Sequence, residues 1–201
     1  MCTWAGVNCV KNGRGIETVV EISLPSNNLR GNVPGLVYYL PSLTVLNLED
    51  NDVALSFGDI GAAKSLLALY VGSTGIVSLE GLGQASKLRI LNIAGNSFFG
   101  EEIPMELSNL TDLEVLDMSQ CGFVGALPPF IGEWTNLTSL TATNNGFEGA
   151  LPGSIFSLTG LKTLILSDNN FFGTLPNSLE NLTSIETLAL DKRAKIGSGF
   201  R

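Results

Sequence analysis

The chain has 201 residues and a formal net charge of -8; 44% of its residues are hydrophobic and 15% are charged. This composition argues against disorder, and the acidic balance argues against nucleic acid or an anionic membrane as the main partner, although acidity also simply provides solubility. The sequence contains no histidine, which excludes Ser-His-Asp and Cys-His catalysis and removes the commonest metal ligand.

Two cysteines lie close together at the start of the chain, within residues 1–18. Cys2 and Cys9 could form a disulfide, which would leave Cys121 as the odd cysteine; free thiols in a reducing compartment are the alternative. No secretory signal precedes Cys2, and no apolar run reaches the roughly 18 residues of a membrane span. We therefore expect this sequence to be a piece of a longer chain.

A repeat fills the chain from residue 19 to residue 190. The frame LxxLxLxxN recurs about eight times, and its last position falls at residues 27, 51, 74, 96, 121, 145, 169 and, less well, 193. This frame, spaced by 22–25 residues, is the signature of leucine-rich repeats. The sequence thus predicts a solenoid of about eight coils, with a frayed or truncated tail at residues 191–201.

Each coil is expected to contribute one short strand to a parallel sheet. Alternate residues of a strand point to opposite faces, so the fourth and sixth frame positions point into a shared core and the third, fifth and seventh point to solvent. The predicted fold class is an α/β horseshoe, wound as a right-handed superhelix. Its parallel strands line the concave face, and 3-10 or irregular turns form the convex face.

The ninth frame position turns the chain away from the strand. An Asn side chain there can both donate to and accept from buried backbone groups, so stacked copies should form a structural ladder. Thr and Cys, which replace Asn in two coils, offer fewer hydrogen bonds. The predicted ladder residues are Asn27, Asn51, Thr74, Asn96, Cys121, Asn145 and Asn169.

Five coils also carry a Gly and a Pro at fixed distances after the ladder residue, as in Asn145–Pro152 (NGFEGALP). Pro suits an outer turn better than a sheet interior. The coils at residues 43–65 and 66–87 lack this Gly-x-hydrophobic-Pro element and are rich in Gly and Ala. In four coils a Phe lies two residues after the ladder residue, and these four rings are expected to stack in a spine rather than form a cofactor site. These residues are Phe98, Phe123, Phe147 and Phe171.

These coils resemble the plant-type leucine-rich repeats of receptor-kinase ectodomains, receptor-like proteins and secreted inhibitors of pectin-degrading enzymes. The segment Cys2–Cys9 (CTWAGVNC) resembles the end of that family's N-terminal cap. The resemblance implies a Cys2–Cys9 bridge and a Trp4 that packs over the first coil. It also implies an extracellular or plasma-membrane location, with the membrane reached only through segments absent from this chain. The longer helical segment before the first cysteine, a C-terminal cysteine pair and a kinase motif are missing.

Three N-x-[ST] sequons begin at Asn109, Asn136 and Asn181. We expect all three to occupy the same surface position just before the next strand, where export would make them glycosylation sites. The alternative is that NLT is simply part of the repeat consensus.

The family often uses the concave face to bind peptides, glycan-rich ligands or proteins, which implies a protein, peptide or glycan ligand here. Tyr70 is the best single candidate, because binding hot spots are rich in Trp, Tyr and Arg. The face is mildly acidic and suits a neutral or basic ligand; a solvated face without a specific ligand is the alternative. The candidate ligand-binding residues are Asn47, Glu49, Tyr70, Asn92, Asp117 and Thr141.

The sequence is therefore interpreted as a recognition module, the extracellular part of a receptor-like protein or receptor kinase. The alternatives are a secreted polygalacturonase-inhibitor-like protein and an intracellular scaffold without disulfide or glycan. No enzyme, cofactor or metal site is expected. The adjacent acids Glu101–Glu102 and Glu49–Asp50 are interpreted as solvated side chains at turns. No catalytic triad, phosphate-binding loop or metal-ligand spacing occurs in the sequence.

Overall fold

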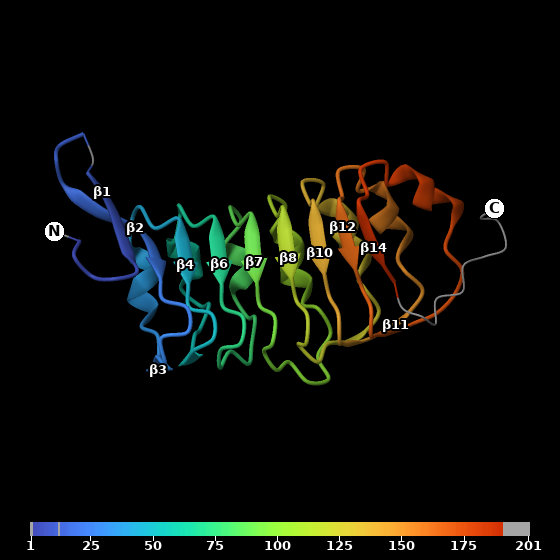
Figure 1. The fold of residues 1–201 in the computed structure, drawn as a ribbon, viewed down its shortest axis with the longest axis horizontal. Coiled ribbons are helices and arrows are strands. Elements are labelled where there is room, and N and C mark those ends of the chain that lie inside the picture. The colour runs from blue at the N-terminus through green and yellow to red at the C-terminus, as the bar shows by residue number, and fades with distance from the viewer. Residues whose placement is uncertain (1, 12, 191–201) are drawn as a thin grey trace.

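The predicted solenoid is confirmed by the computed structural model, which describes residues 2–11 and 13–190. Within these residues, the main sheet has nine strands that stand side by side in chain order (Figure 1). The strands are β1 (Val7–Lys11), β2 (Glu17–Ser23), β4 (Val45–Asn47), β6 (Ala68–Tyr70), β7 (Ile90–Asn92), β8 (Val115–Asp117), β10 (Ser139–Thr141), β12 (Thr163–Ile165) and β14 (Thr187–Ala189). β1 pairs with β2 in antiparallel register, and the remaining neighbours are parallel.

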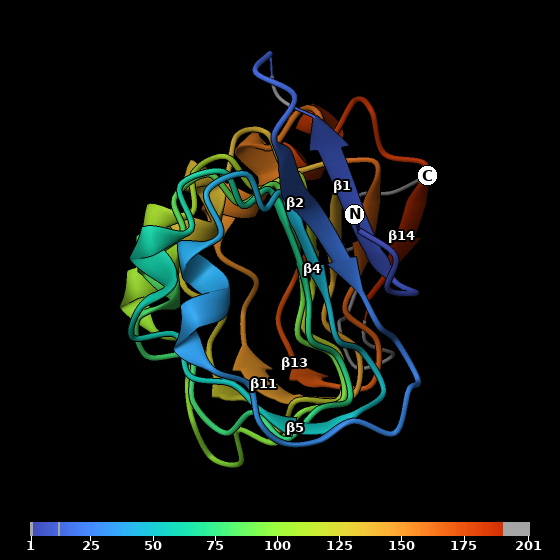
Figure 2. The ribbon, with the colours of Figure 1, turned by 90° about the vertical axis from the view of Figure 1, so that its left-hand side faces the viewer.

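The other sides of each coil carry 3-10 helices and short edge strands. Seen from the N-terminal end, the main sheet forms one side, the helices lie opposite, and β5, β11 and β13 run along the lower edge (Figure 2). The edge strands are β3 (Arg30–Asn32), β5 (Asp52–Ala54), β9 (Val124–Gly125), β11 (Gly146–Gly149) and β13 (Asn170–Phe171). The helices are η1 (Gly35–Tyr39), η2 (Ile60–Ala62), η3 (Leu82–Gln84), η4 (Met105–Asn109), η5 (Pro129–Glu133), η6 (Gly153–Ser157) and η7 (Asn177–Asn181).

Proline decides where the longer helices begin. Each of the five-residue helices follows a Pro whose φ lies between -62° and -76°, a value that its ring imposes and that leads into a helical turn. The two coils without this Pro have the three-residue helices η2 and η3, which follow Asp59 and Gly81. The missing sequence element therefore shortens and reshapes the outer side of these two coils.

The core is a single cluster that runs through all the coils. In the six central coils the fourth and sixth frame positions are buried as predicted, for example Leu46 and Leu48 in β4 and the turn after it. In the terminal coils the expectation does not hold: Ile22 and Leu24 are only partly buried, and Leu188 is 40% exposed. The aromatic spine is confirmed as well. The stacked ring centroids lie 5.0 Å apart for Phe98 and Phe123, 6.1 Å for Phe123 and Phe147, and 6.2 Å for Phe147 and Phe171.

The ladder side chains bind backbone groups of two successive coils. Asn51 Oδ1 accepts from the N–H groups of Asn27 and Leu29 at 3.0 and 2.9 Å. Asn51 Nδ2 lies within 2.9 Å of three carbonyl oxygens, those of Leu24, Leu48 and Glu49. One amide thus satisfies buried backbone groups that would otherwise lack partners.

Cys121 occupies the same ladder position with fewer contacts. Its thiol lies 3.2 Å from the carbonyl oxygen of Ile93 and 3.4 Å from that of Ser119. The N–H of Phe98, which has no side-chain acceptor here, donates instead to the Cys121 carbonyl at 2.8 Å. Burial raises the pKa of the Cys121 thiol to about 12, so it stays protonated and can act as a weak donor.

The N-terminal segment forms a hairpin that is clasped by a disulfide. Cys2 and Cys9 are bonded, with their Cα atoms 6.0 Å apart. The expected packing of Trp4 over the first coil is wrong, because Trp4 lies in the turn before β1 and is 80% exposed. Residues 191–201, the predicted tail, lie outside the described residues.

Candidate functional site

The exposed side of the main sheet, here called the sheet face, carries the candidate ligand-binding residues. Strand register places the fifth frame positions of β4, β6, β7, β8 and β10 directly beside one another. The resulting polar row consists of Asn47, Tyr70, Asn92, Asp117 and Thr141. The structure thus brings five of the six candidates together, each half-buried.

The sixth candidate, Glu49, reaches the same row across a neighbouring strand. Its Oε1 accepts a hydrogen bond of 2.6 Å from Asn92 Nδ2, although β6 lies between their strands. The seventh frame position of the intervening coil is Gly72, where a Cβ would lie 3.2 Å from Asn92 Oδ1 and 3.1 Å from the Ala94 carbonyl oxygen. Gly72 therefore leaves room for the hydrogen bond between Glu49 and Asn92. The glycine at this frame position was the one clue to this contact in the sequence.

Three side chains of the row are fixed by their own backbone. Asn47, Asn92 and Asp117 each accept a hydrogen bond from the N–H two residues further on, at 3.0, 2.9 and 3.0 Å. Such local bonds hold a side chain against the end of its strand. The row is consequently organised before any ligand arrives, which lowers the entropic cost of binding.

The row and Glu49 beside it carry negative charge, and among residues 2–11 and 13–190 neither Glu49 nor Asp117 forms an ion pair. Burial raises the pKa of the Glu49 carboxyl, and the charges of Asp50 and Asp117 raise it further. Two cations lie at the adjoining second frame position, and both are engaged: Arg89 pairs with Glu114, and Lys162 lies 3.6 Å from Glu186. The surface therefore favours donors and cations over anions.

An apolar stripe, which the sequence analysis missed, runs beside the polar row. The third frame positions of β4, β6, β7 and β8 pair in register. They are Val45, Ala68, Ile90 and Val115. The expectation that all third positions face solvent is wrong for Ala68, which is 6% exposed because larger side chains flank it on both neighbouring strands. The β-branched residues Val45, Ile90 and Val115 at the third frame position could have revealed this stripe in the sequence.

The sequons do not share one position, which corrects the expectation. Asn109 and Asn181 are the last residues of η4 and η7, whereas Asn136 lies three residues beyond the end of η5. The coils keep the same register, since Trp134 takes the place of Leu110 and Leu182, but Glu133 replaces the asparagine at the end of the helix and Asn136 lies one residue before the next frame. All three asparagines are exposed.

Over residues 2–11 and 13–190, no group of three or more Cys, Asp or Glu side chains is arranged to hold a metal ion. In the same part of the chain, none of the helices has the length and apolar character needed to span a bilayer.

Comparison with known proteins identifies the repeats. Residues 65–184, more than half of the chain, match the family described as the leucine-rich-repeat domain of EGF-like domain-containing protein ComC. Receptor-like protein 41 of Arabidopsis thaliana is 35% identical over 112 residues, which cover 54% of this chain and 13% of that protein. The chain thus matches about an eighth of the length of such relatives.

Solved structures of plant receptors share the fold. The Arabidopsis receptor kinase HAESA, in complex with the peptide hormone IDA and the co-receptor SERK1, has a TM-score of 0.75 at 26% identity; the match covers 94% of this chain and 36% of that one. The plant peptide hormone receptor RGFR1, in complex with RGF2, has a TM-score of 0.74 at 25% identity, with coverages of 97% and 38%. The chain belongs to the leucine-rich-repeat family, and its repeats are of the plant receptor-like protein and receptor-kinase ectodomain type.

Proposed function

We propose that this chain is an extracellular recognition module that binds an extended peptide along the sheet face, across strands β4 to β10. The observation that carries the proposal is the polar row lying directly beside the apolar stripe. A peptide can place apolar side chains on Val45, Ile90 and Val115 while its backbone and polar groups bond to the row.

The dimensions suit a short linear segment. Five neighbouring strands span about 19 Å at the usual spacing of parallel strands. An extended chain covers that distance with about six residues. A segment of this length also contacts several coils at once, which supports selectivity because each coil presents a different pair of side chains.

The charge of the row supports a basic or neutral peptide. Asp117 belongs to the row and Glu49 reaches it, and the pKa of the Glu49 carboxyl is already raised, in part by the charge of Asp117. A Lys or Arg side chain, or an N-terminal amine, placed between them would relieve this repulsion. Such a contact should weaken as ionic strength rises.

Three observations support an extracellular setting for this module. Cys2 and Cys9 form a disulfide, which persists in oxidising compartments. Each of the three sequon asparagines is exposed and open to glycosylation. The solved relatives are described as hormone-bound receptors. We propose that the chain contributes binding, without catalysis, to a longer receptor-like protein.

The test begins with a display library of random linear 12-residue peptides selected against the purified, unreduced chain. Calorimetry then measures the Kd of an enriched synthetic peptide for the wild type, for the double variant Tyr70→Ala/Asp117→Ala, and for Tyr39→Ala/Asp112→Ala. The control pair removes the same residue types at exposed positions away from the row. Loss of at least about 30-fold in affinity is expected for the first pair only, with unchanged Tm.

Equal affinity of all three proteins would overturn the proposal. Two measurements that do not use a peptide would favour the alternatives. Saturable inhibition of a polygalacturonase would favour the inhibitor. Three free thiols and no glycan on protein from its native source would favour the intracellular scaffold.

A further inference from the structure

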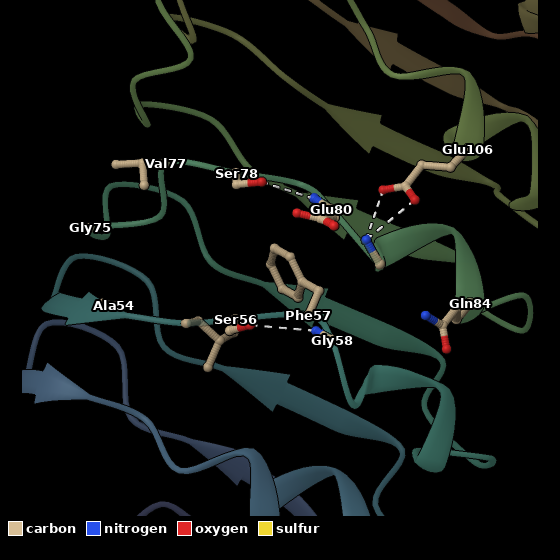
Figure 3. A pocket seen from close by; sticks show the side chains of 12 residues that line it. Ala54, Ser56, Phe57, Gly58, Gly75, Val77, Ser78, Glu80, Gln84 and Glu106 are labelled. Carbon is tan, nitrogen blue, oxygen red and sulfur yellow. Dashed lines mark hydrogen bonds between the residues drawn. The ribbon is translucent and has the colours of Figure 1, made fainter.

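A second hollow lies away from the sheet face, where the coils depart from the repeat consensus. The outer segments of the coils at residues 43–65 and 66–87, together with η4, enclose a pocket of about 610 Å³ (Figure 3). This volume lies within the range of small-molecule sites. The residues that line the pocket include none of the polar row or apolar stripe, so the two surfaces are separate.

Short coils and glycines keep this pocket open. Its two coils are the shortest of the array, because their ladder residues, Asn51 and Thr74, are followed by the next ladder residues after only 23 and 22 residues. Gly58, Gly75 and Gly81 form part of the wall. Gly81 has φ +90°, and a Cβ there would lie 2.6 Å from the Phe57 carbonyl oxygen, so this wall requires glycine.

The pocket has an apolar floor and one acidic wall. Leu55 and Phe57 contribute the floor, and both are more than 90% buried. Glu80 and Glu106 come from neighbouring coils and line the same pocket; in Figure 3 both lie on the side of Phe57 away from Ser56 and Gly58. The Gly81 N–H donates to both oxygens of Glu106, at 3.0 and 3.3 Å, and so fixes that carboxylate in place.

The acidic wall has no protein cation to balance it. The lining contains no Lys or Arg, and across the described residues neither Glu80 nor Glu106 forms an ion pair. Lys64 and Lys87 line a separate hollow of about 50 Å³ that also contacts Gln84. A carboxylate pair beside a buried apolar floor recognises a cation on an apolar body, because the body removes apolar surface from water while the cation meets the charge.

We propose that this pocket binds a primary ammonium or guanidinium group carried on a short apolar body. The cation lies between Glu80 and Glu106, and the body lies against Val77, which is 73% exposed, beside the buried floor of Leu55 and Phe57. A free organic amine and a basic side chain of a peptide present the same chemistry. The site is independent of peptide binding on the sheet face.

The test uses three probes of one shape: 2-phenylethylamine, the neutral 2-phenylethanol and the anionic 3-phenylpropionate. Each is titrated into ¹⁵N-labelled protein while the amide signals of Gly58, Gly75 and Gly81 are followed. Saturable shifts at these glycines are expected for the amine, with at least about tenfold weaker binding of the alcohol and none of the carboxylate. A capped Gly-Arg-Gly peptide then asks whether a peptide-borne cation also enters.

The matched variants are Glu80→Gln/Glu106→Gln in the pocket and Glu101→Gln/Glu102→Gln outside it, where both acids are exposed. The Gln at position 106 keeps an acceptor for the Gly81 N–H, so the fold is retained. Amine binding should fall about tenfold in the first variant and persist in the second. Equal binding of amine and alcohol, no saturable shift with the amine, or unchanged binding in the pocket variant would overturn the proposal.

Discussion

The carboxylate of Glu49 accepts a 2.6 Å hydrogen bond from the side-chain amide of Asn92, two strands away along the sheet. The contact ties the coil of β4 to the coil of β7 over the glycine of the coil between them. It also holds the Glu49 carboxylate beside the polar row, although burial and the charges of Asp50 and Asp117 already disfavour the charged form of Glu49.

That unfavourable charge gives a pH prediction. The pKa of Glu49 is raised in the folded state, so the folded state holds this proton to a higher pH than the unfolded state. Stability therefore falls as pH rises through the raised pKa. Glu49→Gln keeps an acceptor for Asn92 and removes the charge. The variant should be more stable than the wild type at pH 7 by about 0.5 kcal/mol or less, because solvent screens a partly exposed group.

Urea unfolding at pH 7 and at pH 3 measures this difference, which should vanish at the lower pH. Glu133→Gln, an exposed glutamate on η5, serves as the control and should change stability at neither pH. A Glu49→Gln protein that is less stable at pH 7 would contradict the proposed balance of burial and charge.

The ladder makes a sharp stability prediction because two of its members differ in burial. Asn51 is 4% exposed and serves backbone groups of two coils, whereas Asn27 is exposed and its Nδ2 donates only to the Pro25 carbonyl among the described residues. Asn51→Ala should cost about 3 kcal/mol, since several buried backbone groups lose their partners. Asn27→Ala should cost about 0.5 kcal/mol or less. Equal losses in urea unfolding would show that burial does not govern the ladder.

The aromatic spine should matter most at its middle. Phe123 is 1% exposed and stacks on both Phe98 and Phe147. Phe123→Ala should therefore destabilise the fold by about 4 kcal/mol through lost burial and an unfilled cavity. Phe172, in the next coil but one, is 63% exposed, and Phe172→Ala should leave Tm within about 2 °C. Thermal unfolding of the two variants compares them directly, and a larger loss from Phe172→Ala would refute the spine's role.

The cysteines should titrate in two classes. Unreduced protein unfolded in guanidinium should show one reactive thiol, that of Cys121, and reduced protein should show three, because Cys2 and Cys9 are bonded. In the native protein Cys121 should resist alkylation at pH 8, since it is buried and its pKa is raised to about 12. Rapid native labelling of Cys121, or three thiols without reductant, would oppose this assignment.

The strongest sequence signals were periodic ones. The leucine frame predicted the strands and the core, and the shared phase of Phe98, Phe123 and Phe147 predicted their stacking, because stacking similar coils brings equivalent positions into contact. The position of a side chain within its coil is thus readable from one sequence.

Contacts that break the period were not readable in the same way. The bridge from Glu49 to Asn92 needs a glycine in the coil between them. The pocket over Phe57 arises where the consensus is absent. A missing motif indicates irregular structure but not its shape.

The most direct test of peptide binding on the sheet face is contact mapping with the selected peptide. Isotope-filtered NMR on methyl-labelled protein should show intermolecular NOEs from the peptide to the methyl groups of Val45, Ile90 and Val115, whether or not a basic side chain also contacts Val77 at the outer pocket. Peptide NOEs confined to Val77 or to the 3-10 helices, with none to the stripe, would contradict the account.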